Sequence, residues 1–389
     1  MNRRVFLFTA GGAAISAQVP PSKRVTVGII GVGSRGRQLL EACLALPGVR
    51  IGAVCETYEP RLFGAGFLAR EKGHRPRYYR IYSDLIADGD LDAVLIATPD
   101  FWHYRMTLEA LHARKDVYVE QPLCLSWQEG VELRDAERNS RQVVQVGSQR
   151  RSSPLYIEIA ARIAEGAVGR VQMAQAASAS SYLRSGVLRR GGVKFRDPLN
   201  FPDWQAAAVT KVPYSPDRFL NWRFYSMYAG GPVTDLGVHV LDGIHMLTGA
   251  SFPSRVQASG VRSMEEGFDT TERAGLVVEY ANGLLTTMSV NGTAAKLHEN
   301  ALIDGEGGRI EINPQGSTGS VLRPSDDPRL SDATHRHLTN FVECVRNRKR
   351  PNAPISVTFP ATLICQMGNL SIAARQSVRW DAATVRVAE

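Results

Sequence analysis

Cysteine is scarce in this chain, and the copies that occur do not fall into pairs. The 389 residues include five cysteines, which is an odd number, and no two of them form a Cys-x-x-Cys motif. This pattern argues against a disulfide framework and against a zinc ribbon. A chain of this length can bury enough of its surface to fold without such cross-links.

Long apolar runs are missing as well. No stretch reaches the roughly 18–20 apolar residues that a membrane-spanning helix needs, so no integral membrane segment is expected. Hydrophobic residues make up 44% and charged residues 22% of the chain, which is typical of a globular protein rather than of a disordered or coiled-coil protein. At roughly 150 residues per domain, the length favours two domains.

The excess of positive charge is modest and scattered. The formal net charge of +8 includes Arg3 and Arg4, which lie in an N-terminal segment that we expect to be removed. The densest basic run, residues 346–350, is typical of a solvated helix end. The pattern therefore favours an ordinary charged surface over a nucleic-acid-binding site.

Residues 1–19 have the composition of an export signal. Asn2-Arg3-Arg4-Val5-Phe6-Leu7 matches a twin-arginine signature, and the mildly apolar residues 8–17 that follow contain no acidic residue. The alternative is a disordered tail with an accidental Arg-Arg pair. We expect the signal, and therefore a periplasmic or otherwise exported protein. Because the twin-arginine route carries folded proteins, it suits an enzyme that acquires its nucleotide in the cytoplasm.

A glycine-rich turn follows the first predicted strand. Residues 25–30 are rich in β-formers, Gly31-Val32-Gly33-Ser34-Arg35-Gly36 comes next, and residues 37–46 have helical periodicity. In this strand–turn–helix context, the GxGxxG pattern indicates a dinucleotide-binding turn, with the pyrophosphate at the helix N-terminus. Gly31 allows the tight turn, Gly33 lets the backbone approach the pyrophosphate, and Gly36 allows close packing of helix and strand.

An acidic residue ends the second predicted strand. Glu56 follows residues 49–55, at the place where such folds hold the adenosine ribose by a carboxylate. A carboxylate there repels a 2′-phosphate and favours NAD over NADP, although Arg35 and Arg61 lie nearby and leave NADP open. The alternative reading of Glu56 is an ordinary surface loop residue.

Further strands end in polar runs. Residues 92–97 lead into Thr98-Pro99-Asp100-Phe101-Trp102-His103, residues 116–119 into Glu120-Gln121-Pro122, and residues 143–146 into Gly147-Ser148-Gln149-Arg150. Strands that alternate with helices predict a doubly wound parallel sheet of the α/β class. Ligands of such sheets bind at the carboxyl ends of the strands, where these runs lie.

The motifs GVGSRG, ATPDFWH, VYVEQPL and VGSQRR, together with GGPVTDLGVHVLDGIHML at residues 230–247, resemble the Gfo/Idh/MocA superfamily of oxidoreductases. The resemblance extends over the mature chain in the family's order. It implies a Rossmann domain, a second α+β domain with a mostly antiparallel open-faced sheet, and NAD(P)-dependent chemistry on sugars, polyols or their derivatives. It also implies a C-terminal segment that returns to the first domain.

One position departs from the family pattern. The family usually has Glu-Lys-Pro where this chain has Glu120-Gln121-Pro122. In the family the lysine donates or accepts the substrate proton, whereas the amide of Gln121 carries no charge and cannot act as a general acid or base. Gln121 can still orient a substrate oxygen. Relatives that use NAD to cleave glycosidic bonds also lack this lysine.

The second domain has the pattern of a sheet. Residues 171–178, 255–263, 275–280 and 284–290 have strand character, and Ala281-Asn282-Gly283 supplies a hairpin turn. Another strand pair is expected within residues 302–312. The resulting division is a signal at 1–19, a Rossmann domain at 23–150, a sheet domain at 151–335 that also mediates homo-oligomer formation, and a helical return segment at 336–389.

A helix that begins near Pro232 carries candidate catalytic residues. Asp235, His239 and Asp242 lie at i, i+4 and i+7, which places them on one helix face. Asp235 and His239 match the family's Asp-x-x-x-His pair, in which the carboxylate orients the imidazole that takes the hydroxyl proton. A structural histidine is the alternative. A metal site is not expected, because His245 points away from this face and no other ligand has suitable spacing.

Aromatic residues are concentrated between 195 and 228. Nine occur there: Phe195, Phe201, Trp204, Tyr214, Phe219, Trp222, Phe224, Tyr225 and Tyr228. Loops of this length commonly serve as lids or binding loops, and aromatic faces pack well on the C–H faces of sugars. We expect about half of the rings to pack the loop down, and Trp222, Arg223 and Tyr228 to contact substrate.

These observations define a candidate site and three hypotheses. The predicted cofactor-binding residues are Gly31, Gly33, Ser34, Arg35, Gly36, Glu56, Thr98, Pro99, His103, Glu120 and Gln121. The predicted catalytic residues are His239, Asp235, Gln121 and Tyr228, and the predicted substrate residues are Arg150, Trp222, Arg223, Tyr225 and Asp242. The first hypothesis is an NAD(P)-dependent oxidoreductase that acts on a sugar, polyol or glycoside. The others are a redox-neutral, NAD-dependent glycosidase or lyase and a non-catalytic sugar-binding protein.

Overall fold

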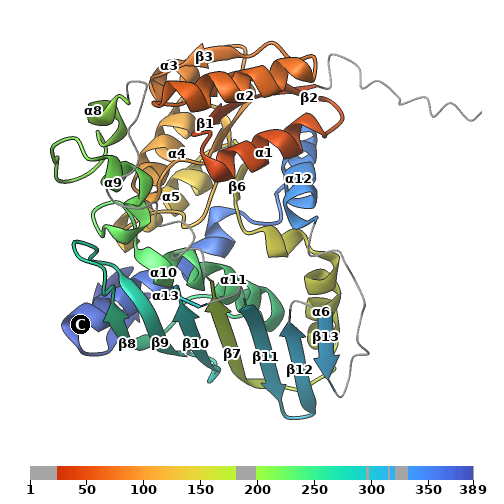
Figure 1. Ribbon diagram of the computed structural model, residues 1–389. Helices are drawn as coiled ribbons and strands as arrows, with labels where there is room; N and C mark the ends of the chain where they lie inside the picture. Colours follow the sequence, from red (N-terminus) through yellow and green to blue (C-terminus); the bar gives the residue numbers. More distant parts are fainter. Residues whose placement is uncertain (1–23, 181–198, 295–297, 314–315, 320–331, 389) are drawn as a thin grey trace, which may run out of the picture.

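The computed structural model describes residues 24–180, 199–294, 298–313, 316–319 and 332–388 (Figure 1). The predicted export signal at residues 1–19 and the aromatic residue Phe195 lie outside the described residues. Within them, a smaller parallel sheet and a larger, mostly antiparallel sheet form two domains, which Figure 1 shows one above the other.

The first domain is built on a six-stranded parallel sheet. Its order, β3-β2-β1-β4-β5-β6, is that of a doubly wound nucleotide-binding sheet. The strands are β1 (Val25–Ile30), β2 (Val49–Cys55), β3 (Arg77–Tyr79), β4 (Ala93–Ile96), β5 (Asp116–Val119) and β6 (Val144–Val146). β1, β4, β5 and β6 are buried throughout, which fits strands with helices on both faces. The predicted fold class is confirmed.

Five helices connect these strands. They are α1 (Ser34–Leu44), α2 (Glu59–Glu71), α3 (Tyr82–Ile86), α4 (His103–His112) and α5 (Trp127–Asn139). α5 begins with a complete capping box, in which the Ser126 side chain and the Glu129 side chain each satisfy the other's backbone N–H. α1 begins at Gly33 with no side-chain cap, which leaves its first N–H groups open toward the carboxyl ends of the strands.

The second domain contains a nine-stranded sheet with the order β13-β12-β11-β7-β10-β9-β8-β14-β15. Neighbouring strands pair antiparallel except β7 with β10. The strands are β7 (Val171–Ala179), β8 (Arg255–Arg262), β9 (Thr271–Glu279), β10 (Leu285–Asn291), β11 (His298–Gly305), β12 (Gly308–Asn313), β13 (Gly316–Gly319), β14 (Val378–Asp381) and β15 (Arg386–Ala388). Gly283, with φ of +85°, makes the turn between β9 and β10.

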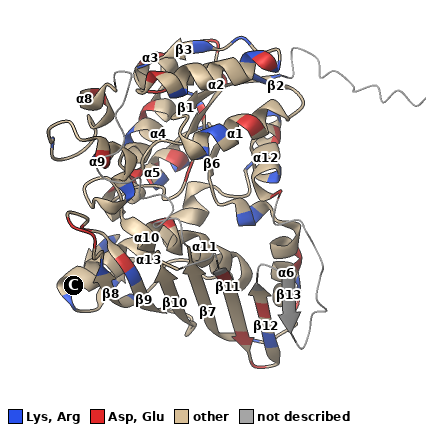
Figure 2. Cartoon of the chain, viewed as in Figure 1, with Lys and Arg blue, Asp and Glu red and all other residues tan. Residues whose placement is uncertain are grey.

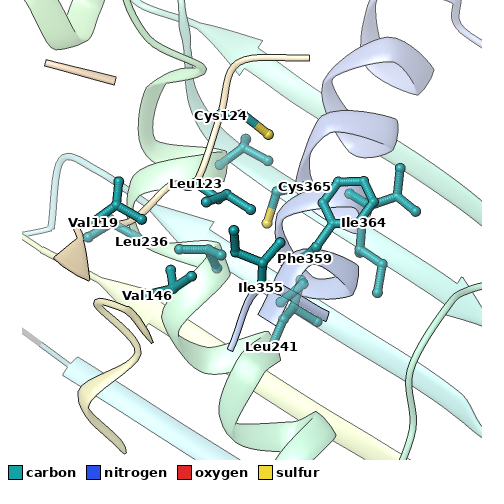
Figure 3. Packing of buried hydrophobic residues seen from close by; sticks show 14 of the residues in the cluster. Val119, Leu123, Cys124, Val146, Leu236, Leu241, Ile355, Phe359, Ile364 and Cys365 are labelled. Atoms are coloured by element: carbon teal, nitrogen blue, oxygen red, sulfur yellow. The ribbon is translucent and has the colours of Figure 1, made fainter. Parts of the chain in front are cut away.

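Helices on one face of this sheet lie between it and the first domain (Figure 1). They are α6 (Pro154–Ala164), α10 (Gly231–Asp235), α11 (Gly237–Thr248) and α13 (Ile355–Ala374). Figure 3 shows Leu236 and Leu241 beside Ile355 and Phe359, with Val119 and Val146 of the first domain close by. These side chains belong to one buried cluster, so the two domains share a core.

The C-terminal residues contact both domains. α12 (Ala333–Asn347) packs its buried face against α1 and the core of the first domain through Leu338, Phe341 and Val342. α13 follows, and β14 and β15 then extend the large sheet, so the return segment contains strands as well as helices. α13 is also the described helix that is long and apolar enough to span a membrane, and 72% of its apolar window is buried inside the molecule.

The segment 231–248 is not one continuous helix. α10 ends at Asp235 and α11 begins at Gly237, with Leu236 between them at φ −93° and ψ −43°. Asp235 and His239 nevertheless stay on the same side of the chain and line one cleft. Charged side chains are interspersed by sign over both domains, as Figure 2 shows.

Candidate active site

A cleft of about 940 Å³ crosses the carboxyl ends of the parallel strands and reaches the start of α11. Its volume lies within the range of small-molecule and cofactor sites. The predicted residues that line it are Gly31, Gly33, Ser34, Arg35, Glu56, Thr98, Pro99, His103, Glu120, Gln121, Trp222, Arg223, Asp235 and His239. One cleft therefore joins the glycine-rich turn to the predicted catalytic histidine.

The glycine-rich turn has the shape that a pyrophosphate requires. Gly31 has φ of +81°, and a Cβ there would lie 2.8 Å from the carbonyl oxygen of Ala97. A Cβ on Gly36 would lie 1.9 Å from the carbonyl oxygen of Gly31, so this glycine is needed for packing. At Gly33, by contrast, a Cβ would point into the open cleft, with Arg61 Nη1 nearest at 3.7 Å. The uncapped start of α1 thus faces open space, which fits a nucleotide phosphate.

Glu56 lies at the end of β2, beside this turn. Its carboxylate accepts hydrogen bonds from the backbone N–H groups of Val32 at 3.2 Å and Thr57 at 2.8 Å. It lines the cleft although it is 9% exposed. This arrangement holds the carboxylate where a ribose hydroxyl can donate to it, and it fits the adenosine half of a dinucleotide.

Arg35 and Glu120 form the centre of a network at the middle of the cleft. Arg35 Nε donates to Glu120 Oε1 at 2.9 Å, and Tyr118 Oη and Gln149 Nε2 donate to the same oxygen at 3.1 and 3.3 Å. Arg35 Nη1 also donates to Thr334 Oγ1 at 3.3 Å, in the first turn of α12. The ion pair therefore fixes the start of α1 against β5 and the returning C-terminal segment.

His103 connects the loops that follow β4 and β5. Its Nδ1 lies 2.7 Å from the carbonyl oxygen of Pro122, and its Nε2 lies 2.9 Å from that of Thr98. Burial lowers the pKa of His103, although both carbonyl groups act in the opposite direction. The side chain is 1% exposed, so it positions two walls of the cleft.

Gln121 occupies the position of the family's lysine and is held by the protein. Its Nε2 donates to Ser148 Oγ at 2.8 Å, and its Oε1 accepts from Thr362 Oγ1 at 3.4 Å. The amide nitrogen keeps a second N–H, and the residue lines the cleft. Gln121 can therefore donate a hydrogen bond, but it offers no proton for transfer.

His239 is half-buried in the first turn of α11 and faces the cleft. Burial lowers the pKa of His239, and the charge of Arg150 lowers it further, whereas Glu299 and Asp235 act to raise it. The imidazole is therefore neutral at neutral pH and can accept a proton. Arg150 itself forms an ion pair with Glu299.

Asp235 is paired with a cation from the aromatic loop. Arg223 Nε lies 3.2 Å from Asp235 Oδ2, and the Arg223 guanidinium lies 4.1 Å from the centre of the Trp222 ring. The structure thus brings Trp222, Arg223, Asp235 and His239 together at one end of the cleft, as the sequence predicted. Their roles in binding and catalysis stay predictions.

Two tyrosines predicted at the site do not line the cleft. Tyr228 is 0% exposed, and its ring packs 4.9 Å from Trp204 and 5.1 Å from Phe101. Tyr225 is 5% exposed, donates to Asp217 and lies 4.3 Å from the Arg218 guanidinium. The structure corrects both assignments, because these rings anchor the loop rather than face a substrate.

Arg150 and Asp242 also lie outside the lining of the cleft. Asp242, 1% exposed, accepts from Arg151 Nε at 2.9 Å with both carboxylate oxygens. Asp242 is therefore an ion-pair partner of the buried Arg151, and its role as a substrate residue stays a prediction. Arg150 acts on His239 through its charge rather than by lining the cleft.

Sequence reasoning left out several cleft residues. Asp100 lines the cleft and lies in a recognised motif, but no role was assigned to it. Glu299, on β11, does not line the cleft but acts on His239 through its charge. The position of Asp100 directly after β4 was a usable signal, because that is where the sheet's ligands bind. The approach of Glu299 to Arg150 and His239 depends on the tertiary structure and had no local signal.

The fold and the cleft define a dinucleotide-binding protein with an attached substrate domain. The profile of the oxidoreductase family with an NAD-binding Rossmann fold (GFO_IDH_MocA) matches residues 25–148, and that of the GFO/IDH/MocA C-terminal domain matches residues 205–311. Together they cover more than half of the chain. The chain belongs to the Gfo/Idh/MocA superfamily and is an NAD-binding oxidoreductase of this family.

Two groups of characterised relatives are similar in sequence. Inositol 2-dehydrogenase 2 of Saccharopolyspora erythraea is 27% identical over 332 residues, which cover 82% of this chain and 84% of that protein. A glycosyl hydrolase family 109 protein of Shewanella sp. W3-18-1 is 34% identical over 137 residues, but the match covers 34% of this chain and 30% of that protein.

Solved structures with the same fold include inositol dehydrogenases. The scyllo-inositol dehydrogenase of Lactobacillus casei with bound NAD(H) and scyllo-inositol superposes with a TM-score of 0.71 at 18% identity, over 92% of this chain and 99% of that chain. The myo-inositol 2-dehydrogenase of Lactobacillus plantarum gives 0.71 at 20% identity over 92% and 99%. At this identity the likeness concerns the fold.

Proposed function

We propose that the protein is an NAD-dependent dehydrogenase of a polyol or sugar. The observation that carries the proposal is that one cleft contains both the nucleotide-binding turn and a neutral histidine, His239, with Asp235, Arg223 and Gln121 around it. The end of the cleft around His239 is polar and has several hydrogen-bond donors and acceptors, which suits a substrate with many hydroxyl groups. The similarity to an inositol 2-dehydrogenase over 82% of the chain supports the same substrate class.

When bound, NAD supplies the acceptor for the hydride that leaves a substrate carbon. The chain supplies the proton chemistry. His239, neutral in its buried setting, accepts the proton of the substrate hydroxyl. Gln121 donates a hydrogen bond that orients a substrate oxygen. Arg223, fixed by Asp235, is a further donor, and Trp222 beside it offers an aromatic wall for a ring C–H face.

The aromatic loop forms part of the cleft wall and contacts the first domain. Leu199 bridges to Tyr58 of the first domain, and Trp102 Nε1 donates to the carbonyl oxygen of Trp204 at 2.8 Å. Phe219 lines the cleft and lies 6.0 Å from Tyr58 and 5.1 Å from the Arg61 guanidinium. A loop anchored at these points supports slow release of the nucleotide.

A nucleotide titration followed by a substrate screen tests the proposal. Purified protein is assayed for bound NAD, loaded with NAD and mixed with polyols and sugars, beginning with myo-inositol, while the absorbance of the reduced nicotinamide is recorded. We expect NAD binding and a rise in that absorbance with at least one compound. A purified protein that does not bind NAD would contradict the proposal.

A second candidate is redox-neutral cleavage of a glycosidic bond. Two observations favour it: Gln121 replaces the lysine, and a glycosyl hydrolase family 109 protein matches 34% of this chain at 34% identity. In such a cycle a transient ketone acidifies the neighbouring C–H, the aglycone leaves, water adds, and the hydride returns. Chromogenic glycosides in D₂O, without added nucleotide, distinguish the two. Aglycone release with deuterium beside the oxidised carbon supports cleavage, whereas net reduction of NAD with the glycoside intact excludes it.

We also propose export by the twin-arginine route, from the Arg3-Arg4 signature described above. An exported enzyme that carries its nucleotide across the membrane would benefit from a cleft that releases the nucleotide slowly. Replacing both arginines by lysine should keep the protein in the cytoplasm of a host with this pathway. Export of that variant at the wild-type level would contradict the signal.

A homo-oligomer through the large sheet is a further part of the proposal. One face of this sheet carries α6, α11 and α13, while residues such as Val261 and Val277 on the strands are 47% and 40% exposed. Light scattering of the purified protein should give a mass that is a multiple of the chain mass, and a monomer at all concentrations would refute it.

A further inference from the structure

The cleft contains a buried carboxyl group that the proposed chemistry does not yet use. Asp100 begins the 3₁₀ turn Asp100–Trp102, directly after β4, and lines the same cleft as His239, Asp235 and Gln121. It is 3% exposed, so it has been removed almost completely from water. A carboxyl in such a place is costly to ionise unless a cation compensates it.

Among the described residues, the nearby charges compensate it only in part. Asp235 and Arg223 face Asp100 from α10 and from the Trp222–Phe224 turn, and Arg223 Nε lies 3.2 Å from Asp235. The Arg223 guanidinium thus acts on both carboxyl groups. On its own element, Asp100 receives a hydrogen bond from its own backbone N–H, and the neighbouring His103 is bound between two carbonyl groups.

The electrostatics agree with this geometry. Burial is the largest effect and raises the pKa of Asp100, and the negative charge of Asp235 raises it further, against the smaller effects of Arg223 and of the backbone N–H. The pKa of Asp100 therefore lies well above the ordinary range of a carboxyl group. When the pKa of one of two close carboxyl groups is raised in this way, the neutral form of that group is favoured.

We propose that Asp100 is the missing donor of the site: a neutral carboxylic acid that donates a hydrogen bond to the substrate oxygen from which His239 takes the proton. As that proton leaves, the oxygen gains negative charge, and the O–H of Asp100 stabilises it without transferring its own proton. Asp100 thus adds a hydrogen-bond donor to the one that the Gln121 amide offers. A carboxylic acid kept neutral by burial so that it can donate is an established device of enzymes.

The inference rests on the proposed function for its kinetic part, but its physical core can be measured without turnover. Protein labelled with ¹³C at the aspartate carboxyl groups is loaded with NAD, and infrared difference spectra at neutral pH are recorded in H₂O and D₂O. We expect a protonated-carboxyl band that shifts in D₂O and is absent from Asp100→Asn. Asp135→Asn, on the outer face of α5, should keep the band. A wild-type spectrum without a protonated carboxyl band at neutral pH overturns the proposal, even if the enzyme is active.

The kinetic test uses a matched pair of variants with the substrate found in the screen. Asp100→Ala removes the donor and should lower kcat/KM by about 10²–10³-fold. Asp100→Asn keeps an N–H donor, so it should retain more activity and lose the decline at high pH that ionisation of Asp100 causes in the wild type. Equal losses in both variants, with the wild-type pH profile unchanged, would contradict the proposal. If no substrate is found, the spectra still decide the state of Asp100.

Discussion

His239 determines how the proposed reaction responds to pH. Burial and Arg150 place its pKa below the ordinary value, so the imidazole loses its proton at a pH where a free histidine, with a pKa of about 6.5, is still partly charged. A base must be unprotonated. Activity should therefore rise with pH through a limb below about pH 6.5 and be at its plateau at neutral pH.

Replacement of this histidine gives the first prediction. His239→Ala should lower kcat/KM by about 10²–10⁴-fold and remove the acidic limb, because both ring nitrogens of His103, the other imidazole in the described cleft lining, are bound to carbonyl groups. NAD affinity should change little. Steady-state kinetics from pH 5 to pH 8 and an NAD titration give the result. An unchanged acidic limb in the variant would assign that limb to another group.

The turn between β1 and α1 gives the next prediction at the scale of the element. Gly33→Ala places its Cβ in the open cleft, at φ −65°, so the fold should persist while NAD affinity falls by about tenfold or more. Gly36→Ala places its Cβ 1.9 Å from the Gly31 carbonyl oxygen and should destabilise the fold itself. Calorimetric NAD titration and urea unfolding separate the two effects. Normal NAD binding by Gly33→Ala would contradict the assigned pyrophosphate site.

Local signals predicted most of the first domain. The β1 and β2 boundaries agree with the sequence-based ranges, because short buried strands followed by glycine or an acidic residue have few alternative structures. The short strands β3, β14 and β15 were not foreseen, because three or four residues carry little periodic signal. Their pairing depends on neighbours that are distant in sequence.

The candidate site was predictable where the family motif and the strand ends coincide. Gly33, Glu56 and His239 follow from such positions. Tyr228 could not be placed from sequence, because an aromatic residue in a loop can face either the cleft or the core, and contacts with Phe101 and Trp204 decide it. The surroundings of Asp100 could not be predicted either, because its burial and its proximity to Asp235 depend on the tertiary structure.

At the scale of the whole molecule, a buried ion pair fixes α11 to the segment that follows β6. Arg151 follows β6, and Asp242 lies on α11, with side chains 9% and 2% exposed. Asp242→Asn leaves the Arg151 charge buried and should lower the free energy of unfolding by about 3–5 kcal/mol. Arg162→Gln, which breaks an exposed pair with Glu158, should cost less than about 1 kcal/mol. Urea denaturation measures the free energy of unfolding of both variants. Equally small losses of stability would show that the Arg151–Asp242 ion pair contributes little.

The aromatic loop beside the cleft also contacts the first domain. Phe219 is 3% exposed and lines the cleft beside Arg61, so Phe219→Ala should open this wall and speed NAD dissociation by about tenfold. Tyr214 lies in the same loop but is 54% exposed and outside the cleft lining, so Tyr214→Ala serves as the control. Stopped-flow displacement of NAD gives both rates. Equal rates in the two variants would mean that the loop does not retain the nucleotide.

Transfer of a labelled hydrogen tests the central claim most directly. The NAD-loaded protein is mixed with polyols and sugars deuterated on their ring carbons, myo-inositol first, and the nucleotide is then recovered and weighed by mass spectrometry. We expect one deuterium on the nucleotide for the wild type, and about 10²–10⁴-fold slower labelling for His239→Ala with the same NAD bound. A nucleotide that is bound but stays unlabelled with every polyol and sugar would contradict it.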